Sequence, residues 1–458
     1  MKRIFQILGV ISILLLSSCS QEELIIETTT PNQNLSENVM AINKYISLHH
    51  PTKSRNESPN LCPIIHNGDT VAFLANYNDG WELFSNNTDL PMVLMRAESG
   101  SFYPGTFNSQ NPSFNALYNE LIKNLTSEAK NDEPNPTWAI FCMPKKLKED
   151  DGVDHWGFVG QAVEINSTKY TPKGGRLSTQ WGQRGNYNQH TPYVLGSIDN
   201  HHAALGCGAV AVGQLVYHSN KYFGYPKTTV NSFSYSENAN WFAFSGDDST
   251  IWTKMDSGSD PNFCNDKEKM KPTSIFLGYI ANLVTLHFED INDKNTNSKA
   301  ETCFWILSGQ KNIIMEQLEY SWAKILSNFN VGHPVYAYSS EHAFIIDYAE
   351  LVTEQWFDVY TYTNKCNDND FGTDKEDKDE SELDPNQMAP SKEYYRQKYT
   401  GDIEFNLVSS SINNRWLKMN WGWGGLYNDV KINADASIWE INGVDLTISR
   451  IFSYKLNR

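Results

Sequence analysis

Residues 205–218 read Leu-Gly-Cys-Gly-Ala-Val-Ala-Val-Gly-Gln-Leu-Val-Tyr-His, and they carry the strongest structural signal in the chain. The small and apolar residues after Cys207 have a spacing that predicts a buried helix packed closely against a neighbour. A cysteine in the first turn of such a helix lies near unpaired backbone N–H groups and the positive end of the dipole, which favour the thiolate. The stretch alone is equally compatible with a small core residue, because free cysteine is often buried.

Composition limits the classes of function. The chain has 458 residues, of which 40% are hydrophobic and 13% aromatic, and its net charge is −17. This length allows two domains, and the composition is typical of packed globular protein. The negative charge argues against nucleic-acid binding by the chain as a whole. The seven cysteines show no spacing typical of zinc ligands, so we expect neither a metal nor another cofactor.

The first 19 residues resemble a bacterial lipoprotein signal peptide. Lys2 and Arg3 precede an apolar run that is too short for an ordinary membrane-spanning helix. Leu16-Ser17-Ser18-Cys19 then resembles a lipobox, in which Cys19 becomes the lipidated N-terminus; a plain secretory signal is the alternative. We therefore expect a lipid anchor in the bacterial cell envelope, at the outer membrane or cell surface. Residues 20–36 are polar and are predicted to form a tether.

Residues 37–165 are predicted to form a compact α+β unit without catalytic residues. The predicted elements are a helix at 37–49, a hairpin of strands 70–77 and 81–85, a strand from 90, and a helix at 115–125. Residues 161–176 are basic, contain glycine and have few apolar groups. They are interpreted either as a linker accessible to proteases or as an ordinary surface loop.

Residues 170–458 are predicted to form a second α+β domain, in which helices come first and strands follow. The predicted helices begin at 207, 272 and 313, and the predicted strands lie at 335–338, 343–347, 403–408, 415–421, 430–432 and 446–454. The inserted segment 364–398 is strongly acidic. Its carboxylates lack the register of a calcium-binding loop, so a solvated loop is the preferred interpretation.

A thiolate nucleophile needs a base within hydrogen-bond reach and a third group that orients the base. His342 stands at the start of the apolar strand 343–347, which is suited to hold an imidazole rigidly. It follows Cys207 by 135 residues (342 minus 207), which fits the spacing of roughly 130–150 in papain-like enzymes. His218 lies roughly 16 Å along the predicted helix and is excluded as the base. His333, before a proline, is the strongest competing candidate.

The third motif is Asn420-Trp-Gly-Trp-Gly-Gly425. The Asn420 oxygen is able to accept a hydrogen bond from the histidine and fix its tautomer. Trp421 is able to cover that contact from water or to hold the ring by packing. Both orienting roles remain open, as does an aromatic turn without any role.

Together these residues resemble the streptopain family of papain-like cysteine peptidases. The resemblance rests on Gly206-Cys207 and the helix after it, on Gly332-His-Pro-Val-Tyr336, on His342-Ala-Phe-Ile-Ile-Asp347 and on the Trp-Gly-Trp motif. Gln180-Trp-Gly-Gln183 is similar to the segment that supplies the oxyanion glutamine of the family, which implies that role for Gln183. Residues 70–100 resemble the family's prodomain. The resemblance implies a papain-like fold with a smaller N-terminal inhibitory prodomain, synthesis as a zymogen, and protein or peptide substrates.

Two features depart from the family pattern. Ser340-Glu341 stand where the family usually has two glycines before the histidine, and the acidic insertion is longer than usual. Neither removes a catalytic group. A catalytically inactive surface lipoprotein that binds peptides or protease partners is the competing hypothesis. An amidase or acyltransferase acting on cell-wall peptides is a second alternative, because it would use the same Cys-His chemistry.

Overall fold

In the computed structural model, the chain is described over ranges that cover both predicted domains. The described residues are 33–50, 61–103, 112–126, 129–131, 133–142, 156–193, 202–223, 233–234, 241–242, 249–255, 263–284, 313–318, 321–338, 343–362, 391–398, 403–408, 411–425, 427–436 and 450–456. Outside them lie Cys19 and the predicted signal peptide, the tether up to residue 32, the predicted base His342 and residues 364–390 of the acidic segment.

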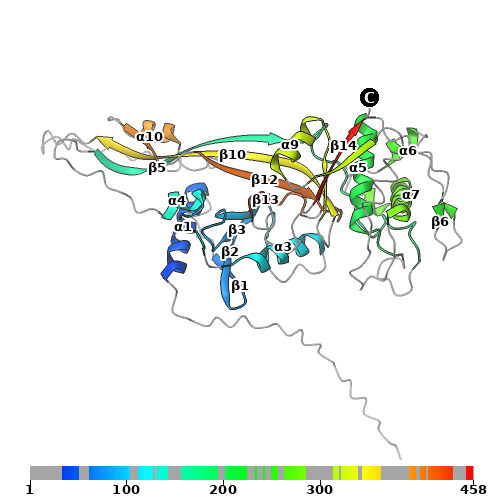
Figure 1. The fold of residues 1–458 in the computed structure, drawn as a ribbon, viewed down its shortest axis with the longest axis horizontal. Helices are drawn as coiled ribbons and strands as arrows, with labels where there is room; N and C mark the ends of the chain where they lie inside the picture. Colours follow the sequence, from blue (N-terminus) through cyan, green and yellow to red (C-terminus); the bar gives the residue numbers. More distant parts are fainter. Residues whose placement is uncertain are drawn as a thin grey trace, which may run out of the picture.

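One large antiparallel sheet organises the described part of the chain (Figure 1). Its strands are β1 (Leu61–His66), β2 (Asp69–Tyr77), β3 (Gly80–Ser85), β4 (Val93–Ala97), β5 (Trp156–Tyr170), β8 (Ile313–Leu318), β9 (Val335–Tyr338), β10 (Ala343–Tyr362), β11 (Ile403–Leu407), β12 (Ile412–Asn420), β13 (Lys431–Asn433) and β14 (Arg450–Leu456). The strand order is β1-β2-β3-β4-β13-β12-β10-β9-β14-β8, and β5 and β11 also pair with β10. The expected mixed α+β class, with a large antiparallel sheet, is confirmed.

The helices lie in two groups. Their bounds are α1 (Gln33–His49), α3 (Pro112–Asn124), α4 (Pro136–Cys142), α5 (Cys207–Phe223), α6 (Ser249–Lys254), α7 (Lys267–Val284), α9 (Trp322–Asn330) and α10 (Lys392–Lys398). In Figure 1, α5, α6 and α7 gather at one end of the long strands, whereas α1, α3 and α4 lie beneath the sheet with β1–β3. None of the helices in the described ranges is long and apolar enough to cross a membrane.

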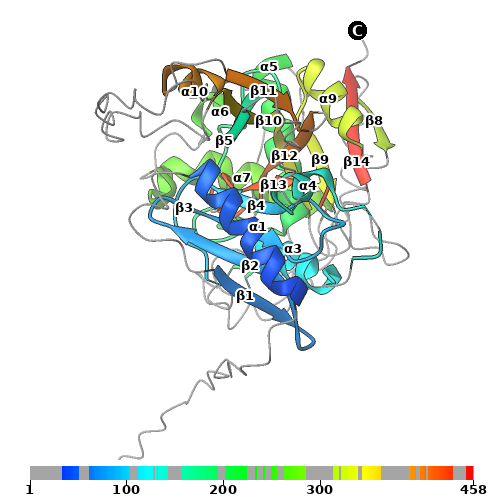
Figure 2. The same ribbon diagram turned by 90° about the vertical axis from the view of Figure 1, so that its left-hand side faces the viewer.

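The N-terminal elements join the same sheet as the rest of the chain (Figure 2). The predicted hairpin is present, because β2 and β3 pair across the turn that follows Tyr77. Strand β4 then pairs with β13 through Met95 and Ile432. Apolar residues from both parts of the chain share one core, including Leu83, Phe114 and Leu417. The predicted prodomain therefore packs as an extension of the C-terminal sheet.

The expected linker at 161–176 is wrong for its first ten residues, because they belong to strand β5. This strand pairs with β10 from Tyr170 opposite Ala349 to Trp156 opposite Tyr362. Ala162 and Val163 are buried between the sheet and its covering residues. The few apolar residues of the segment suggested a loop, but a partner strand far away in the sequence supplies its backbone hydrogen bonds.

Three other expectations need correction. The predicted helix from 313 to 329 is strand β8 followed by α9, because β14 pairs with residues 313–318 along their whole length. The helix predicted to open at Pro272 begins at Lys267 and contains this proline within its second turn. The end of the predicted acidic loop is helix α10, in which Tyr395 is buried. Elsewhere α1 begins at Gln33, inside the predicted tether.

Candidate active site

Helix α5 begins at Cys207, as the sequence predicts, and its residues 208–219 are buried. Gly206 precedes it with a φ of 87°, a left-handed conformation that glycine adopts without strain. This turn directs the chain into the helix, and the N–H of Val210 donates to the Gly206 oxygen at 3.2 Å. Cys207 is free of any disulfide and partly exposed. The nucleophile candidate thus lies at the N-terminus of an otherwise buried helix.

The Cys207 sulfur is surrounded by backbone donors. The N–H of Ala343, the first residue of β10, donates to Sγ at 3.4 Å. Burial raises the pKa of the Cys207 thiol, while hydrogen bonds from the backbone N–H groups of Ala343, Gly208 and Cys207 act in the opposite direction. The net shift is upward, so a neighbouring cation is needed to hold a thiolate near neutral pH.

Gln183 lies beside the segment that leads into α5. Its backbone oxygen accepts a hydrogen bond from Leu205 N at 3.0 Å, two residues before Cys207. Its side chain is buried, and its Nε2 has no hydrogen-bond partner among the described residues. Trp181, fully buried against Tyr217 and Phe276, fixes the preceding backbone. An unpaired buried amide is costly, so its retention suits a donor for an oxygen that is present only during reaction.

The two competing histidines lie toward the other end of α5. His218 Nε2 lies 3.0 Å from the Lys173 oxygen, and the His218 ring packs near Tyr222. His333 packs against Phe223, with ring centroids 4.4 Å apart. Burial lowers the pKa of both histidines to about 4, so both are neutral at pH 7. Their places agree with the sequence-based choice against them.

Asn420 and Trp421 lie where β12 ends, and both are almost completely buried. Asn420 pairs with Ile345 across the sheet, and its Nδ2 donates to the Thr179 oxygen at 2.6 Å. Its Oδ1 accepts from Gly422 N at 3.2 Å. In the described residues Asn420 thus joins β12 to the segment carrying Gln183. Its predicted contact with His342 stays a prediction.

Trp421 packs against the beginning of β10. Its ring centroid lies 5.1 Å from that of Phe344, two residues after His342 in the sequence. Its Nε1 donates to the Tyr427 oxygen at 3.2 Å. The next residue, Gly422, has a φ of 71°, and a Cβ there would lie 3.0 Å from the Val210 side chain. The glycine therefore lets this loop approach α5 closely. A role for Trp421 in orienting His342 stays a prediction.

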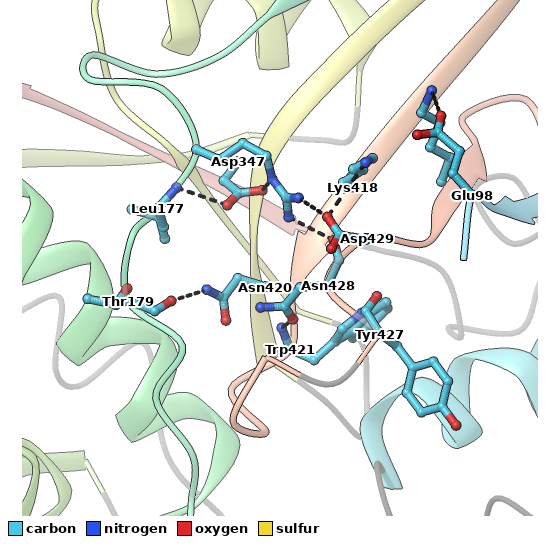
Figure 3. A network of polar contacts seen from close by, with 12 residues as sticks. Glu98, Leu177, Thr179, Asp347, Lys418, Asn420, Trp421, Tyr427, Asn428 and Asp429 are labelled. Carbon is cyan, nitrogen blue, oxygen red and sulfur yellow. Dashed lines mark hydrogen bonds and ion pairs between the residues drawn. The ribbon is translucent and has the colours of Figure 1, made fainter. Parts of the chain in front are cut away.

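An ion pair between Arg176 and the buried Asp347 was not predicted from the sequence; Figure 3 labels Asp347 with its neighbours Leu177 and Asp429. Asp347 of β10 is buried, and Arg176 Nε lies 3.1 Å from its Oδ1. Leu177 N donates to the other carboxylate oxygen at 3.0 Å. The signal available in the sequence was a charged residue at the end of the apolar run Ala343–Ile346, because a buried carboxylate requires a partner.

A cavity elsewhere contains none of the predicted site residues. It lies between α1, β4 and the strands β10 and β12, and Tyr45, Arg96, Glu354 and Trp416 are among its lining residues. Within the described ranges, no group of three His, Cys, Asp or Glu side chains is arranged to hold a metal ion.

The chain matches no protein-family model and no curated protein. Among solved structures, it is similar to a fragment of prointerpain A from Prevotella intermedia, with a TM-score of 0.44 and 15% sequence identity. The match covers 86% of this chain and 97% of the prointerpain A fragment.

Proposed function

We propose that the chain is a cysteine endopeptidase made as a zymogen, with Cys207 as nucleophile and His342 as general base. The observation that carries the proposal is the 3.4 Å contact between Cys207 Sγ and the backbone nitrogen of Ala343. Ala343 directly follows His342, and consecutive Cα atoms are only about 3.8 Å apart. This contact, one residue after His342 in the sequence, supports the proposed pairing of the histidine with a sulfur at a helix N-terminus.

The reaction follows from these residue types. His342 accepts the thiol proton of Cys207, and the thiolate attacks the carbonyl carbon of a peptide bond. The C–N bond breaks as His342 gives its proton to the departing amine, which leaves a thioester on Cys207. Water then attacks the thioester carbonyl while His342 takes a proton from the water. The C–S bond breaks, the peptide acid leaves, and His342 returns the proton to the Cys207 sulfur.

The charge that develops on the carbonyl oxygen needs donors that are already in place. The backbone N–H of Cys207 at the start of α5 and the unpaired amide of Gln183 are the two candidates. Because both donors are fixed before the reaction, they stabilise the transition state without reorganising. The burial of Gln183 strengthens its hydrogen bond to the oxyanion.

The N-terminal unit is proposed as the inhibitory prodomain. Phe114 of α3 stacks on Tyr427 with centroids 4.7 Å apart and meets the Trp421 ring edge-on at 5.8 Å. Helix α3 therefore contacts the loop that follows Asn420. Removing it would free this loop, which supports activation by proteolytic processing. Lipidation at Cys19 would deliver the zymogen to the cell envelope.

The test uses residues 20–458 as wild type, Cys207→Ala and Cys62→Ala. Cys62 is a free, exposed cysteine in β1, so it controls for loss of a thiol away from the site. Intact mass and casein digestion are followed with and without iodoacetamide. We expect wild type and Cys62→Ala to shorten and digest casein, and Cys207→Ala to do neither.

A peptide-binding protein without catalysis is the second candidate, because a partly buried free thiol at the start of a helix packed in the core also fits a structural cysteine. Wild-type protein that stays inert to casein after trypsin has removed its N-terminal unit would support this candidate. The same protein should then bind unfolded casein as tightly as Cys207→Ala does.

A further inference from the structure

We propose that Arg176 is a positioning residue, which acts through Asp347 to hold the Gln183 segment against β10 and so keeps the oxyanion donor in register with Cys207. This inference rests on the proposed function. Arg176 lies in the segment 171–183, which leads from β5 to Gln183, and it does not contact the Cys207 sulfur.

Every nitrogen of the Arg176 guanidinium has an oxygen partner. Besides Nε on Asp347, Nη1 lies 2.6 Å from an Asp429 carboxylate oxygen, and Nη2 donates to the Asn428 oxygen at 2.7 Å. One carboxylate oxygen of Asp347 accepts a hydrogen bond from Arg176 Nε, and the other accepts one from Leu177 N. A planar fork that binds three separate acceptors fixes direction as well as charge.

Figure 3 shows the three segments joined in this way at Leu177, Asp347 and Asn428. Each of them carries a part of the candidate site. The segment from Arg176 continues to Gln183. Asp347 lies on β10, whose first residue, Ala343, donates to Cys207 Sγ. Asn428 Oδ1 accepts a hydrogen bond from Trp421 N at 3.1 Å and so holds the loop after Asn420.

Other contacts follow from the same placement. The Thr179 oxygen, three residues after Arg176, receives Asn420 Nδ2, and the Trp181 oxygen receives Gly424 N at 3.3 Å. These bonds form only if the segment lies along β10 and β12 in one register. Among these contacts of the segment 171–183, that of Arg176 comes first in the sequence and is the charged one. Its partner Asp347 is 1% exposed.

The charge on Asp347 explains why a neutral replacement at position 176 should disturb the segment. The pKa of the Asp347 carboxyl is raised on balance, because its burial and the nearby Asp429 outweigh Arg176 and the Leu177 N–H, which lower it, so the charged form depends on the guanidinium. Without the guanidinium, the buried carboxylate keeps, among the described residues, the Leu177 N–H as its donor, with Asp429 nearby. The segment would then shift to admit water to that carboxylate.

The closing experiment compares processed wild type with Arg176→Ala, Arg176→Lys and Gln183→Ala. Peptide hydrolysis and the rate of Cys207 alkylation by iodoacetamide are measured on the same samples. Alkylation needs the thiolate but no oxyanion hole, so it separates misplacement of Gln183 from collapse of the site. Arg415→Ala is the matched control, because Arg415 also pairs with an aspartate, Asp435, which lies just after β13 and outside the segments of the candidate site.

We expect Arg176→Ala to lower kcat about 10- to 100-fold, with the alkylation rate within about twofold of wild type. Arg176→Lys should recover part of kcat, because it keeps the charge but not the fork. The double variant Arg176→Ala/Gln183→Ala should have the same kcat as Gln183→Ala alone, since both changes act through the same oxyanion donor. Arg415→Ala should keep wild-type kcat.

Three results overturn the positioning role: a kcat of Arg176→Ala equal to wild type, a parallel loss of hydrolysis and alkylation, or multiplying effects in the double variant. If Arg176→Ala does not fold, Arg176→Lys decides, with a fall in kcat of about 3- to 10-fold at unchanged alkylation expected. Wild type without hydrolysis overturns the proposed function, and the positioning role falls with it.

Discussion

The two ends of helix α5 offer opposite environments to a polar side chain. At its start, the backbone N–H of Ala343 donates to the Cys207 sulfur, and the Gln183 Nε2 has no partner among the described residues. Toward its end, a carbonyl oxygen faces His218 among aromatic rings. Hydrogen-bond donors suit a negative charge, whereas a carbonyl and rings hold a neutral imidazole. The surroundings at each end of α5 therefore distinguish Cys207, the proposed nucleophile, from His218, which we expect to have a structural role.

Among the substitutions that test the difference between the two ends of α5, Gln183→Ala is expected to have the largest effect on kcat. Gln183→Ala should lower kcat by about 10²- to 10³-fold, because it removes a preorganised donor to the oxyanion. Its thermal stability should remain close to wild type, since the described residues give its Nε2 no partner to lose.

Gln214 is the matched control for Gln183, because it is also a buried glutamine. Its Oε1 accepts a hydrogen bond from Thr179 Oγ1 at 2.8 Å, which ties α5 to the segment 171–183, whereas its Nε2, like that of Gln183, has no hydrogen-bond partner among the described residues. Gln214→Ala should therefore destabilise the fold by about 1–3 kcal/mol while changing kcat far less than Gln183→Ala does. Equal kcat values for the two variants would remove the distinction between a reactive and a structural amide.

Trp421 and Asn420 should differ in a smaller but measurable way. Trp421→Ala removes the packing on Phe344, and Asn420→Ala removes the bond to the Thr179 oxygen. If Trp421 orients His342, its replacement should lower kcat more than tenfold and alter the pH profile of kcat. Asn420→Ala should then act mainly on stability, by about 1–2 kcal/mol, as measured by urea unfolding. The reverse pattern would assign the orienting role to Asn420.

The smallest effect on activity is expected at the other end of α5. The folded pKa of His218 is lowered from 6.5 to about 4, so between these values the unfolded chain binds a proton that the folded chain does not. The free energy of unfolding should therefore fall as pH falls from about 6.5 to 4, by up to about 3 kcal/mol for this histidine.

His218→Leu should reduce that pH dependence and leave kcat of the processed enzyme within about threefold of wild type. Urea unfolding at several pH values measures the first effect. A slope identical to wild type, or loss of hydrolysis at unchanged folding, would show that the two ends of α5 are not separate in function.

The sequence predicted those elements whose pattern is local. Helix α5, the β2–β3 hairpin and the start of β10 follow from spacing, a turn motif and an apolar run. Strands β5 and β8 were missed because their partners, β10 and β14, lie far away in the chain. In particular, apolar residues three and four apart in 313–318 also fit a helix, and only pairing with β14 decides between the two structures.

The candidate site shows the same division. Cys207 and Gln183 were predicted from their motifs, and the structure brings their segments together through Leu205. Arg176 was interpreted as part of an exposed linker, because nothing near it in sequence reveals Asp347, which is 171 residues away. A long-range ion pair leaves no periodic signal, so it becomes visible only once β10 and the 171–183 segment lie side by side.

The pH dependence of Cys207 alkylation by iodoacetamide, in wild type and in His342→Ala, examines the proposed pairing of Cys207 with His342 most directly. Both proteins also carry Cys62→Ala, so that the exposed Cys62 thiol does not contribute to the measured alkylation. Burial raises the pKa of the Cys207 thiol in the described surroundings. If His342 supplies the missing cation, alkylation in the wild-type background should persist well below pH 8 and move to higher pH in His342→Ala. Superimposable profiles would contradict the pair and leave Cys207 as a buried thiol at the start of a helix.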